Sequence, residues 1–299
     1  MKFDITVNSI NFKHPFLLAS GPPTRTTEMI MRAFAEGWAG AVTKTITVTG
    51  TQSPRPRLET SRTSGRNVIL ENIELLSDYP ADIWAKWLRE IREYYPDNPV
   101  IASIMAPADK PQEWADLAES MIRSGARGVE LNVSCPHGMP ERAAGAFIGQ
   151  DPALTAEITS AVRKKIEAPV WVKLTPNVTD ITAIGKAAVE SGADGLAAIN
   201  TLSGIAGVDL RTLAPLPKVN DRSAAGGISG PGIKPIALRC VAQLAGLRVP
   251  LSGMGGVDDW RDAAEFILLG ASTVQICTAV MFRGYGIIHD LKRKLSNYL

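Results

Sequence analysis

Cysteine is scarce in this chain of 299 residues, which has only Cys135, Cys240 and Cys277. These residues lie far apart, and no CxxC pair or Cys/His cluster offers a zinc or iron–sulfur motif. An odd number of cysteines also argues against a disulfide scaffold. The three histidines are too dispersed to form a metal set. We therefore expect no metal site, and a reducing cytoplasm fits this cysteine usage best.

Other absences exclude further classes. The net charge is only +2, and no run of Lys or Arg resembles a nucleic-acid footprint, so a polyanion partner is not expected. No apolar stretch is long enough to span a bilayer, and residues 1–7 lack the apolar core of a signal peptide. The motifs GxSxG, HExxH, GxxxxGK(S/T) and a strand-linked GxGxxG are missing, which leaves hydrolase, zinc protease and P-loop interpretations without support.

Short apolar runs alternate with longer helical patterns along nearly the whole chain. The strand candidates are residues 16–19, 41–44, 100–104, 128–131, 170–174, 195–199, 249–252 and 273–276. The helical segments are 28–36, 81–94, 112–124, 152–165, 181–191, 235–245 and 260–269, and 280–298 follows the last strand. Several helices are followed by a glycine suited to a left-handed cap before the next strand.

Eight strand-plus-helix units predict a single (β/α)8 barrel domain over residues 1–299. A doubly wound sheet is the competing architecture, and the number of units favours the barrel. Two connections, 45–79 and 201–234, are much longer than the others. Both leave the carboxyl end of a strand, so we expect them to form the roof of a site.

The segment 132–139 (NVSCPHGM) follows the strand candidate 128–131 directly. It places Cys135 where a buried strand gives way to a loop, at the edge where α/β folds build their sites. Its thiol can give or accept a proton, and Asn132 and His137 offer hydrogen bonds nearby. The plain alternative is that Cys135 is a small buried hydrophobic residue, as most free cysteines are.

A glycine-bearing segment, 252–256 (SGMGG), follows the seventh strand candidate, and 277–279 (CTA) follows the eighth. Barrels commonly bind phosphate at exposed backbone N–H groups in this position. Glycine has no Cβ, so its backbone can approach a phosphate closely. Simple tight turns are the alternative interpretation of these glycines.

Two lysines, Lys44 and Lys173, lie at or near strand ends, where burial is costly unless an anion or an electron-rich ring meets the charge. In the plain alternative, each pairs with a carboxylate and does nothing else. A flavin suits them, because its reduced ring carries negative charge near N1. Four asparagines are also expected at the mouth, and their amides match a ring with alternating C=O and N–H groups, although a sugar or a peptide would use amides too. They are Asn72, Asn132, Asn177 and Asn200.

In combination, several segments resemble dihydropyrimidine dehydrogenase, in particular its FMN- and pyrimidine-binding barrel, a relative of class 1 dihydroorotate dehydrogenase. The main ones are 130–139 (ELNVSCPHGM), 173–180 (KLTPNVTD) and 199–204 (INTLSG). Segments 19–23, 43–45, 103–105, 227–230 and 235–239 match as well, so the resemblance covers nearly the whole chain.

The resemblance implies an FMN across the barrel mouth and a pyrimidine stacked on it. The implied FMN-binding residues are Ser20, Lys44, Asn132, Lys173, Asn200, Gly230, Gly255, Gly256, Cys277 and Thr278. The implied substrate-binding residues are Asn72, Asn132, His137, Asn200 and Thr201. Cys135 would be the general acid that protonates C5 while N5 of the flavin delivers hydride to C6, and Ser134 would orient its loop.

The sequence also departs from this family. Dihydropyrimidine dehydrogenases take electrons from a nicotinamide through iron–sulfur clusters, and this chain has no cysteines for such clusters. We therefore expect a separate electron-transfer partner or a soluble acceptor, and a homodimer by analogy. The alternatives are a class 1 dihydroorotate dehydrogenase, in which the Cys-Pro is typically followed by Asn rather than His137, and a flavin- or phosphate-binding barrel that has lost catalysis.

Overall fold

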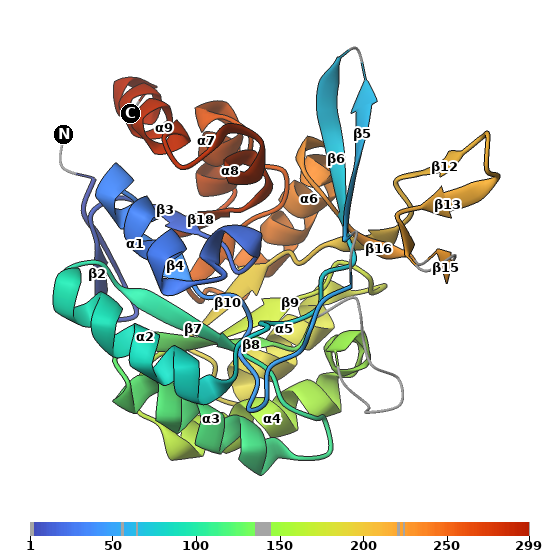
Figure 1. The fold of residues 1–299 in the computed structure, drawn as a ribbon. Helices are drawn as coiled ribbons and strands as arrows, with labels where there is room; N and C mark the ends of the chain where they lie inside the picture. The colour runs from blue at the N-terminus through green and yellow to red at the C-terminus, as the bar shows by residue number, and fades with distance from the viewer. Residues whose placement is uncertain are drawn as a thin grey trace.

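A closed barrel of eight parallel strands forms the centre of the computed structural model, which describes residues 3–54, 57–63, 65–134, 145–219, 222–223 and 225–298 (Figure 1). Around the barrel the strands follow the order β10-β17-β18-β3-β4-β7-β8-β9. In chain order they are β3 (Phe16–Leu18), β4 (Gly40–Val42), β7 (Val100–Ile104), β8 (Gly128–Asn132), β9 (Val170–Leu174), β10 (Gly195–Ala198), β17 (Leu251–Gly253) and β18 (Thr273–Ile276). Each overlaps a strand candidate, and the predicted (β/α)8 barrel is confirmed over the doubly wound sheet.

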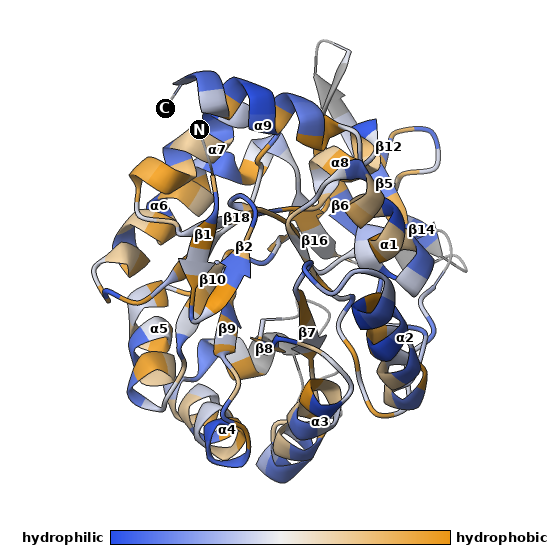
Figure 2. Ribbon diagram, turned by 90° about the vertical axis from the view of Figure 1, so that its left-hand side faces the viewer, coloured by the Kyte–Doolittle hydropathy of each residue, from blue (hydrophilic) through white to orange (hydrophobic). Residues whose placement is uncertain are grey.

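Helices surround the strands, with hydrophilic and hydrophobic stretches alternating along them (Figure 2). They are α1 (Thr27–Glu36), α2 (Ala81–Tyr94), α3 (Pro111–Arg123), α4 (Pro152–Lys165), α5 (Ile181–Glu190), α6 (Lys234–Ala245), α7 (Trp260–Leu268), α8 (Thr278–Arg283) and α9 (Ile287–Tyr298). Their apolar faces pack on the barrel; for example, Trp84 and Trp114 are fully buried. Glycine caps occur as predicted: Gly37 ends α1 with φ 99°, and its N–H donates to carbonyls of the last turn.

Two helices form the end of the chain. The sequence treats residues 280–298 as a single segment after the last strand, whereas the structure has two helices in this region, α8 and α9. Gly284 follows α8 with φ 79°, a conformation that favours glycine and that cannot continue a right-handed helix. The chain therefore turns between the two helices.

A short hairpin closes the amino-terminal end of the barrel. Its strands β1 (Ile5–Val7) and β2 (Ile10–Phe12) were not predicted from the sequence. Its apolar side chains pack in one buried cluster with barrel residues that include Leu17, Val42 and Trp171. Because this end is filled, the carboxyl end of the strands is left to form a site.

The two long connections contain strands of their own. From them β11 (Leu202–Gly204), β16 (Gly226–Ser229), β6 (Arg66–Asn72) and β5 (Leu58–Thr63) form one antiparallel sheet in that order. The hairpin of β5 and β6 and that of β12 (Gly207–Asp209) and β13 (Ala214–Leu216) project from the barrel (Figure 1), and β14 (Lys218–Val219) pairs with β15 (Arg222–Ser223). Strand β6 thereby carries Asn72 to the barrel mouth, as expected for a roof. No helix in the described part of the chain is long and apolar enough to cross a membrane.

Candidate active site

Two buried lysines lie at the carboxyl end of the barrel. Lys44 follows β4 and is 6% exposed, and Lys173 belongs to β9 and is 4% exposed. The Nζ atom of Lys44 lies 2.9 Å from Oε2 of Glu74, and the Nζ atom of Lys173 lies 3.5 Å from Oε1 of Glu130. Both lysines also line a cavity. Each lysine therefore pairs with a carboxylate and also faces the cavity, so the two alternatives considered from the sequence do not exclude each other. The paired carboxylates offset the cost of burying the two charges.

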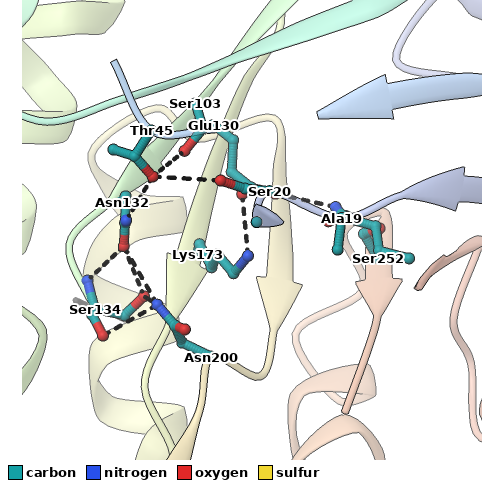
Figure 3. Close-up of polar contacts among 12 residues, drawn as sticks. Ala19, Ser20, Thr45, Ser103, Glu130, Asn132, Ser134, Lys173, Asn200 and Ser252 are labelled. Carbon is teal, nitrogen blue, oxygen red and sulfur yellow. Dashed lines mark hydrogen bonds and ion pairs between the residues drawn. The ribbon is translucent and has the colours of Figure 1, made fainter. Parts of the chain in front are cut away.

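A hydrogen-bonded network fixes the amides beside Lys173 (Figure 3). Asn132, at the end of β8, donates through Nδ2 to Thr45 Oγ1 at 2.8 Å, and the Thr45 hydroxyl is 3.0 Å from that of Ser103. The other side of Asn132, Oδ1, accepts from the Ser134 hydroxyl at 3.2 Å. Asn200 donates through Nδ2 to Ser134 Oγ at 2.9 Å. The two asparagines are therefore held in defined orientations by their neighbours.

The roof contributes groups that are only partly bonded to protein. Asn72 Oδ1 accepts a hydrogen bond from the backbone N–H of Glu74 at 2.5 Å, and no bond from its amide NH2 is present within the described chain. The hydroxyl oxygen of Thr201 is buried and has no hydrogen-bond partner among the described residues. A buried polar atom without a partner is costly, and a ligand in the adjoining cavity would satisfy it.

One predicted mouth residue has a different place. The Asn177 side chain donates to the carbonyl oxygen of Thr201 at 3.1 Å and accepts from the backbone N–H of Ser203 at 2.9 Å. It does not line the cavity, because its amide is used to hold the chain that follows β10. The prediction that Asn177 lines the mouth is therefore wrong. Its side chain instead holds the backbone of Thr201 in place.

The glycine segment after β17 also lines the cavity. Gly255 and Gly256 have φ angles of 116° and 85°, in the region that favours glycine. A Cβ at position 256 would lie 2.8 Å from the backbone N of Lys234 and 2.9 Å from the carbonyl O of Gly230. Within the described residues, the N–H groups of Gly255 and Gly256 donate to no protein acceptor. A simple tight turn does not require free N–H groups in a closely packed backbone. The arrangement therefore favours an anion-binding site.

Cys277 follows β18 on the same side of the cavity. Burial raises the pKa of its thiol to about 11, although Lys173 and Lys44 act in the opposite direction. Its Sγ atom would be only 2.6 Å from a Cβ at position 21, so Gly21 allows the chain after β3 to pass close to it. The thiol is therefore uncharged at neutral pH and contributes a packing surface.

One cavity with about 1030 Å³ of empty space, part of it open to solvent, joins these groups. It brings together most of the residues predicted from the sequence: Ser20, Lys44, Asn72, Asn132, Lys173, Asn200, Thr201, Gly230, Gly255, Gly256, Cys277 and Thr278. Ser134 does not line it but is fully buried and bonded to two residues that do. Cys135 and His137 lie outside the described residues.

Sequence reasoning missed the two carboxylates of the site. Glu74 lines the cavity, and Glu130 lies beneath Lys173, where Gln275 Nε2 donates to its Oε2 atom at 3.0 Å. A usable signal existed, since two lysines expected at a barrel mouth require counter-charges. The sequence does not show which of the nearby acidic residues would provide them.

Comparison with known proteins assigns the chain to a family. The model of the dihydroorotate dehydrogenase family matches residues 3–299. The chain is 41% identical to the chloroplastic dihydropyrimidine dehydrogenase (NADP(+)) of Arabidopsis thaliana, covering 99% of this chain and 72% of that protein. It is 39% identical to the NAD-dependent dihydropyrimidine dehydrogenase subunit PreA of Escherichia coli strain K12, again covering 99% and 72%.

Similarity is as high on the dihydroorotate side. The catalytic subunit of dihydroorotate dehydrogenase B (NAD(+)) from Pyrococcus abyssi is 41% identical, covering 99% of this chain and 93% of that protein. A crystal structure of dihydroorotate dehydrogenase from Eimeria tenella in complex with ferulenol superposes with a TM-score of 0.82 at 20% identity, covering 99% and 84% of the two chains. That likeness confirms the fold. The chain belongs to the dihydroorotate dehydrogenase family, and it is an oxidoreductase that acts on CH–CH groups.

Proposed function

We propose that this protein is an FMN-dependent oxidoreductase that reduces the C5–C6 double bond of uracil or thymine, or catalyses the reverse oxidation. The observation that carries the proposal is one cavity lined by two buried lysines, three asparagine side chains and a glycine segment with free N–H groups. The names of the Arabidopsis and Escherichia coli relatives support a pyrimidine substrate.

The residues of the cavity fit an FMN. Gly255 and Gly256 offer unbonded N–H groups to a phosphate where a side chain would not fit. Lys44 and Lys173 would donate to the isoalloxazine, and the remaining frame would come from Ser20, Asn132, Asn200, Gly230, Cys277 and Thr278. When bound, FMN would supply the hydride that is transferred from its N5 atom to C6 of the pyrimidine.

The pyrimidine would be held by side chains whose orientation the fold already sets. Asn132 and Asn200 are fixed by Thr45 and Ser134, so their remaining hydrogen-bonding capacity faces a ligand without reorganisation. Asn72 would contribute its amide NH2, and Thr201 would use its unbonded hydroxyl. His137, outside the described residues, stays a predicted substrate contact.

Cys135 would act as the general acid and give its proton to C5 of the pyrimidine. A thiol with an ordinary pKa of about 8.5 is mostly protonated at pH 7, which suits this role. In the oxidative direction, the thiolate would take the proton back. Ser134 directly precedes Cys135 and is anchored to Asn132 and Asn200, so we assign it a positioning role.

Dihydroorotate is the second candidate substrate, and the Pyrococcus relative supports it as strongly as the other names support uracil. The non-catalytic barrel that the sequence left open is not supported, because relatives that are 39–41% identical over nearly the whole chain are named as dehydrogenases. Electrons would come from a separate subunit or go to a soluble acceptor, in line with the word subunit in the name of the Escherichia coli relative. The cytoplasmic location and the homodimer stay predictions.

The visible spectrum of the purified protein tests the proposal. We expect a flavin band that bleaches with dithionite under anaerobic conditions and returns when uracil or thymine is added. Return with orotate alone would move the assignment to dihydroorotate chemistry. No flavin band after reconstitution with FMN would contradict the proposed flavin chemistry.

The Cys135→Ser variant tests the proton donor in the same assay. We expect the variant to bind flavin and uracil but to reoxidise at least about 100-fold more slowly, the usual contribution of a general acid. Cys240→Ala is the matched control, because Cys240 is buried in α6 away from the cavity. Equal rates for Cys135→Ser and the control would contradict the role of Cys135.

A further inference from the structure

The positive charge of Lys44 is already neutralised at the cavity wall. Glu74 contacts Lys44 Nζ at 2.9 Å through Oε2, and the two side chains are 1% and 7% exposed. The second oxygen, Oε1, lies 3.1 Å from Nε of Arg57, whose side chain is 21% exposed and does not line the cavity. Glu74 therefore lies between an inner cation and an outer one, and its carboxylate balances the charge of the inner one.

The other lysine of the cavity is matched in the same way. Lys173 has Glu130 at 3.5 Å, and Gln275 donates to the second oxygen of this carboxylate at 3.0 Å. The charged side chains that line the described cavity are Lys44, Glu74 and Lys173. With Glu130 beneath Lys173, the described wall presents no unpaired cationic side chain to a substrate.

Glu74 lies next to the proposed pyrimidine contacts. Its backbone N–H donates to Asn72 Oδ1 at 2.5 Å, and both residues line the cavity. Leu70, Leu75 and Leu76 line the same stretch of wall. An apolar wall with a paired carboxylate suits the hydrogen or methyl substituent of a neutral ring, whereas a second carboxylate there would be desolvated beside a like charge.

We propose that Glu74 is a specificity-determining residue that makes the cavity accept uncharged pyrimidines and reject pyrimidines with a carboxylate, such as orotate. This inference rests on the proposed function and deepens it, because it selects between the two substrate classes of the family. Glu74 acts by pairing with Lys44 in the cavity wall, next to the proposed contact Asn72, and by adding its own negative charge.

Binding of ligands to the oxidised, flavin-loaded protein tests the inference without relying on turnover. Dissociation constants for uracil and orotate are measured from the perturbation of the flavin spectrum. In the wild type we expect uracil to bind at least tenfold more tightly than orotate. In Glu74→Gln we expect the ratio of the two constants to shift toward orotate by at least tenfold, which corresponds to about 1.4 kcal/mol.

Glu130→Gln is the matched control, because it removes the same charge from the other buried pair without changing the cavity wall. Its ratio should change less than threefold. Arg57→Gln leaves the Lys44–Glu74 pair intact and removes a nearby positive charge, so orotate should bind no better than in the wild type. Tighter orotate binding in Arg57→Gln, or equal shifts in Glu74→Gln and Glu130→Gln, would overturn the inference.

Orotamide, the uncharged amide of orotate, keeps the test valid if Glu74→Gln does not fold. In the wild type, orotamide should bind at least tenfold more tightly than orotate, since only the charge differs appreciably. Equal binding of the two, or tighter binding of orotate than of uracil, would overturn the role of Glu74 while leaving the proposed flavin enzyme intact. A protein that takes up no flavin would overturn the proposed function together with this inference.

Discussion

The Nζ atom of Lys173 lies 3.5 Å from the Oε1 atom of Glu130, and the strands that carry them, β9 and β8, are neighbours in the barrel. Both side chains are almost completely buried, at 5% and 1% exposure. Lys173 lines the cavity, and its counter-charge, Glu130, thus comes from the adjacent strand. Charge balance in the site is a property of the barrel itself and does not depend on a ligand.

Breaking this pair should be costly. We expect Glu130→Ala to lower the free energy of unfolding by about 3–5 kcal/mol, because Lys173 would stay buried without a partner. Lys186→Ala is the control, since it breaks a pair with Glu190 in which both side chains are 66% exposed, and it should cost less than about 1 kcal/mol. Urea unfolding of the flavin-free protein measures both. Similar losses in the two variants would contradict the importance of burial.

The barrel was predictable because its elements are local. Apolar runs, helical periodicity and glycine caps such as Gly37 are all visible in a short window of sequence. The hairpin of β5 and β6 was missed because β5 reads LETSRT and lacks an apolar alternation, and β6, RNVILEN, has only a short apolar run. Such strands form through pairing with each other and with β16, which lies more than a hundred residues away in the chain.

The site residues that could be predicted are those at or just after the ends of strands. Lys44, Asn132 and Lys173 lie at or directly after the carboxyl ends of strands, so the barrel brings them together once its order is known. Glu74 could not be assigned, because Glu71 is an equally plausible partner from sequence alone. In the structure Glu71 turns to the other side of β6, where the backbone N–H of Ala206 donates to it, and burial raises its pKa.

The unbonded hydroxyl of Thr201 should matter for ligand binding and not for folding. We expect Thr201→Val to weaken uracil binding about tenfold, since a hydrogen bond to the ligand is lost, while the free energy of unfolding stays within about 0.5 kcal/mol or rises. Thr159→Val is the contrasting variant: the Thr159 hydroxyl donates to the Thr155 carbonyl at 2.7 Å, so stability should fall by about 1 kcal/mol with uracil affinity unchanged. Uracil titration and urea unfolding separate the two effects. An unchanged uracil affinity in Thr201→Val would remove Thr201 from the substrate site.

Gly256→Ala should damage the proposed phosphate site. The residue has φ 85°, and the new Cβ would approach the backbone of Lys234 and Gly230 to within 3 Å, so the chain must shift. We expect at least a tenfold loss of FMN affinity, measured by fluorescence titration of the flavin-free protein. Gly284→Ala is the control for backbone strain alone: Gly284 has φ 79° and no atom within 4 Å of the Cβ position, so FMN affinity should not change. A loss of the same size in Gly284→Ala would show that the effect is a general consequence of strain.

Stability should fall in mild acid because of His14. This residue is 3% exposed; its Nε2 lies 2.8 Å from the Gly37 carbonyl oxygen, and its Nδ1 accepts from the Phe16 N–H at 3.3 Å, an arrangement that a neutral ring satisfies. Burial lowers the pKa of His14 from 6.5 to about 4, and the positive charges of Lys292 and Lys13 add to this. The unfolded chain therefore binds the proton more readily, and stability is lost as the pH falls from 6.5 toward 4.

The size of this effect and its control follow from the same pKa shift. A shift of this size corresponds to at most about 3 kcal/mol, fully present above pH 6.5 and lost progressively down to pH 4. His14→Gln removes the titrating group, so the decline in its free energy of unfolding over this window should be smaller than in the wild type by up to that amount. His289→Gln is the matched variant, because His289 is 65% exposed and lies 3.0 Å from Glu36. Urea unfolding at a series of pH values measures all three proteins, and an unchanged pH dependence in His14→Gln would contradict the assignment.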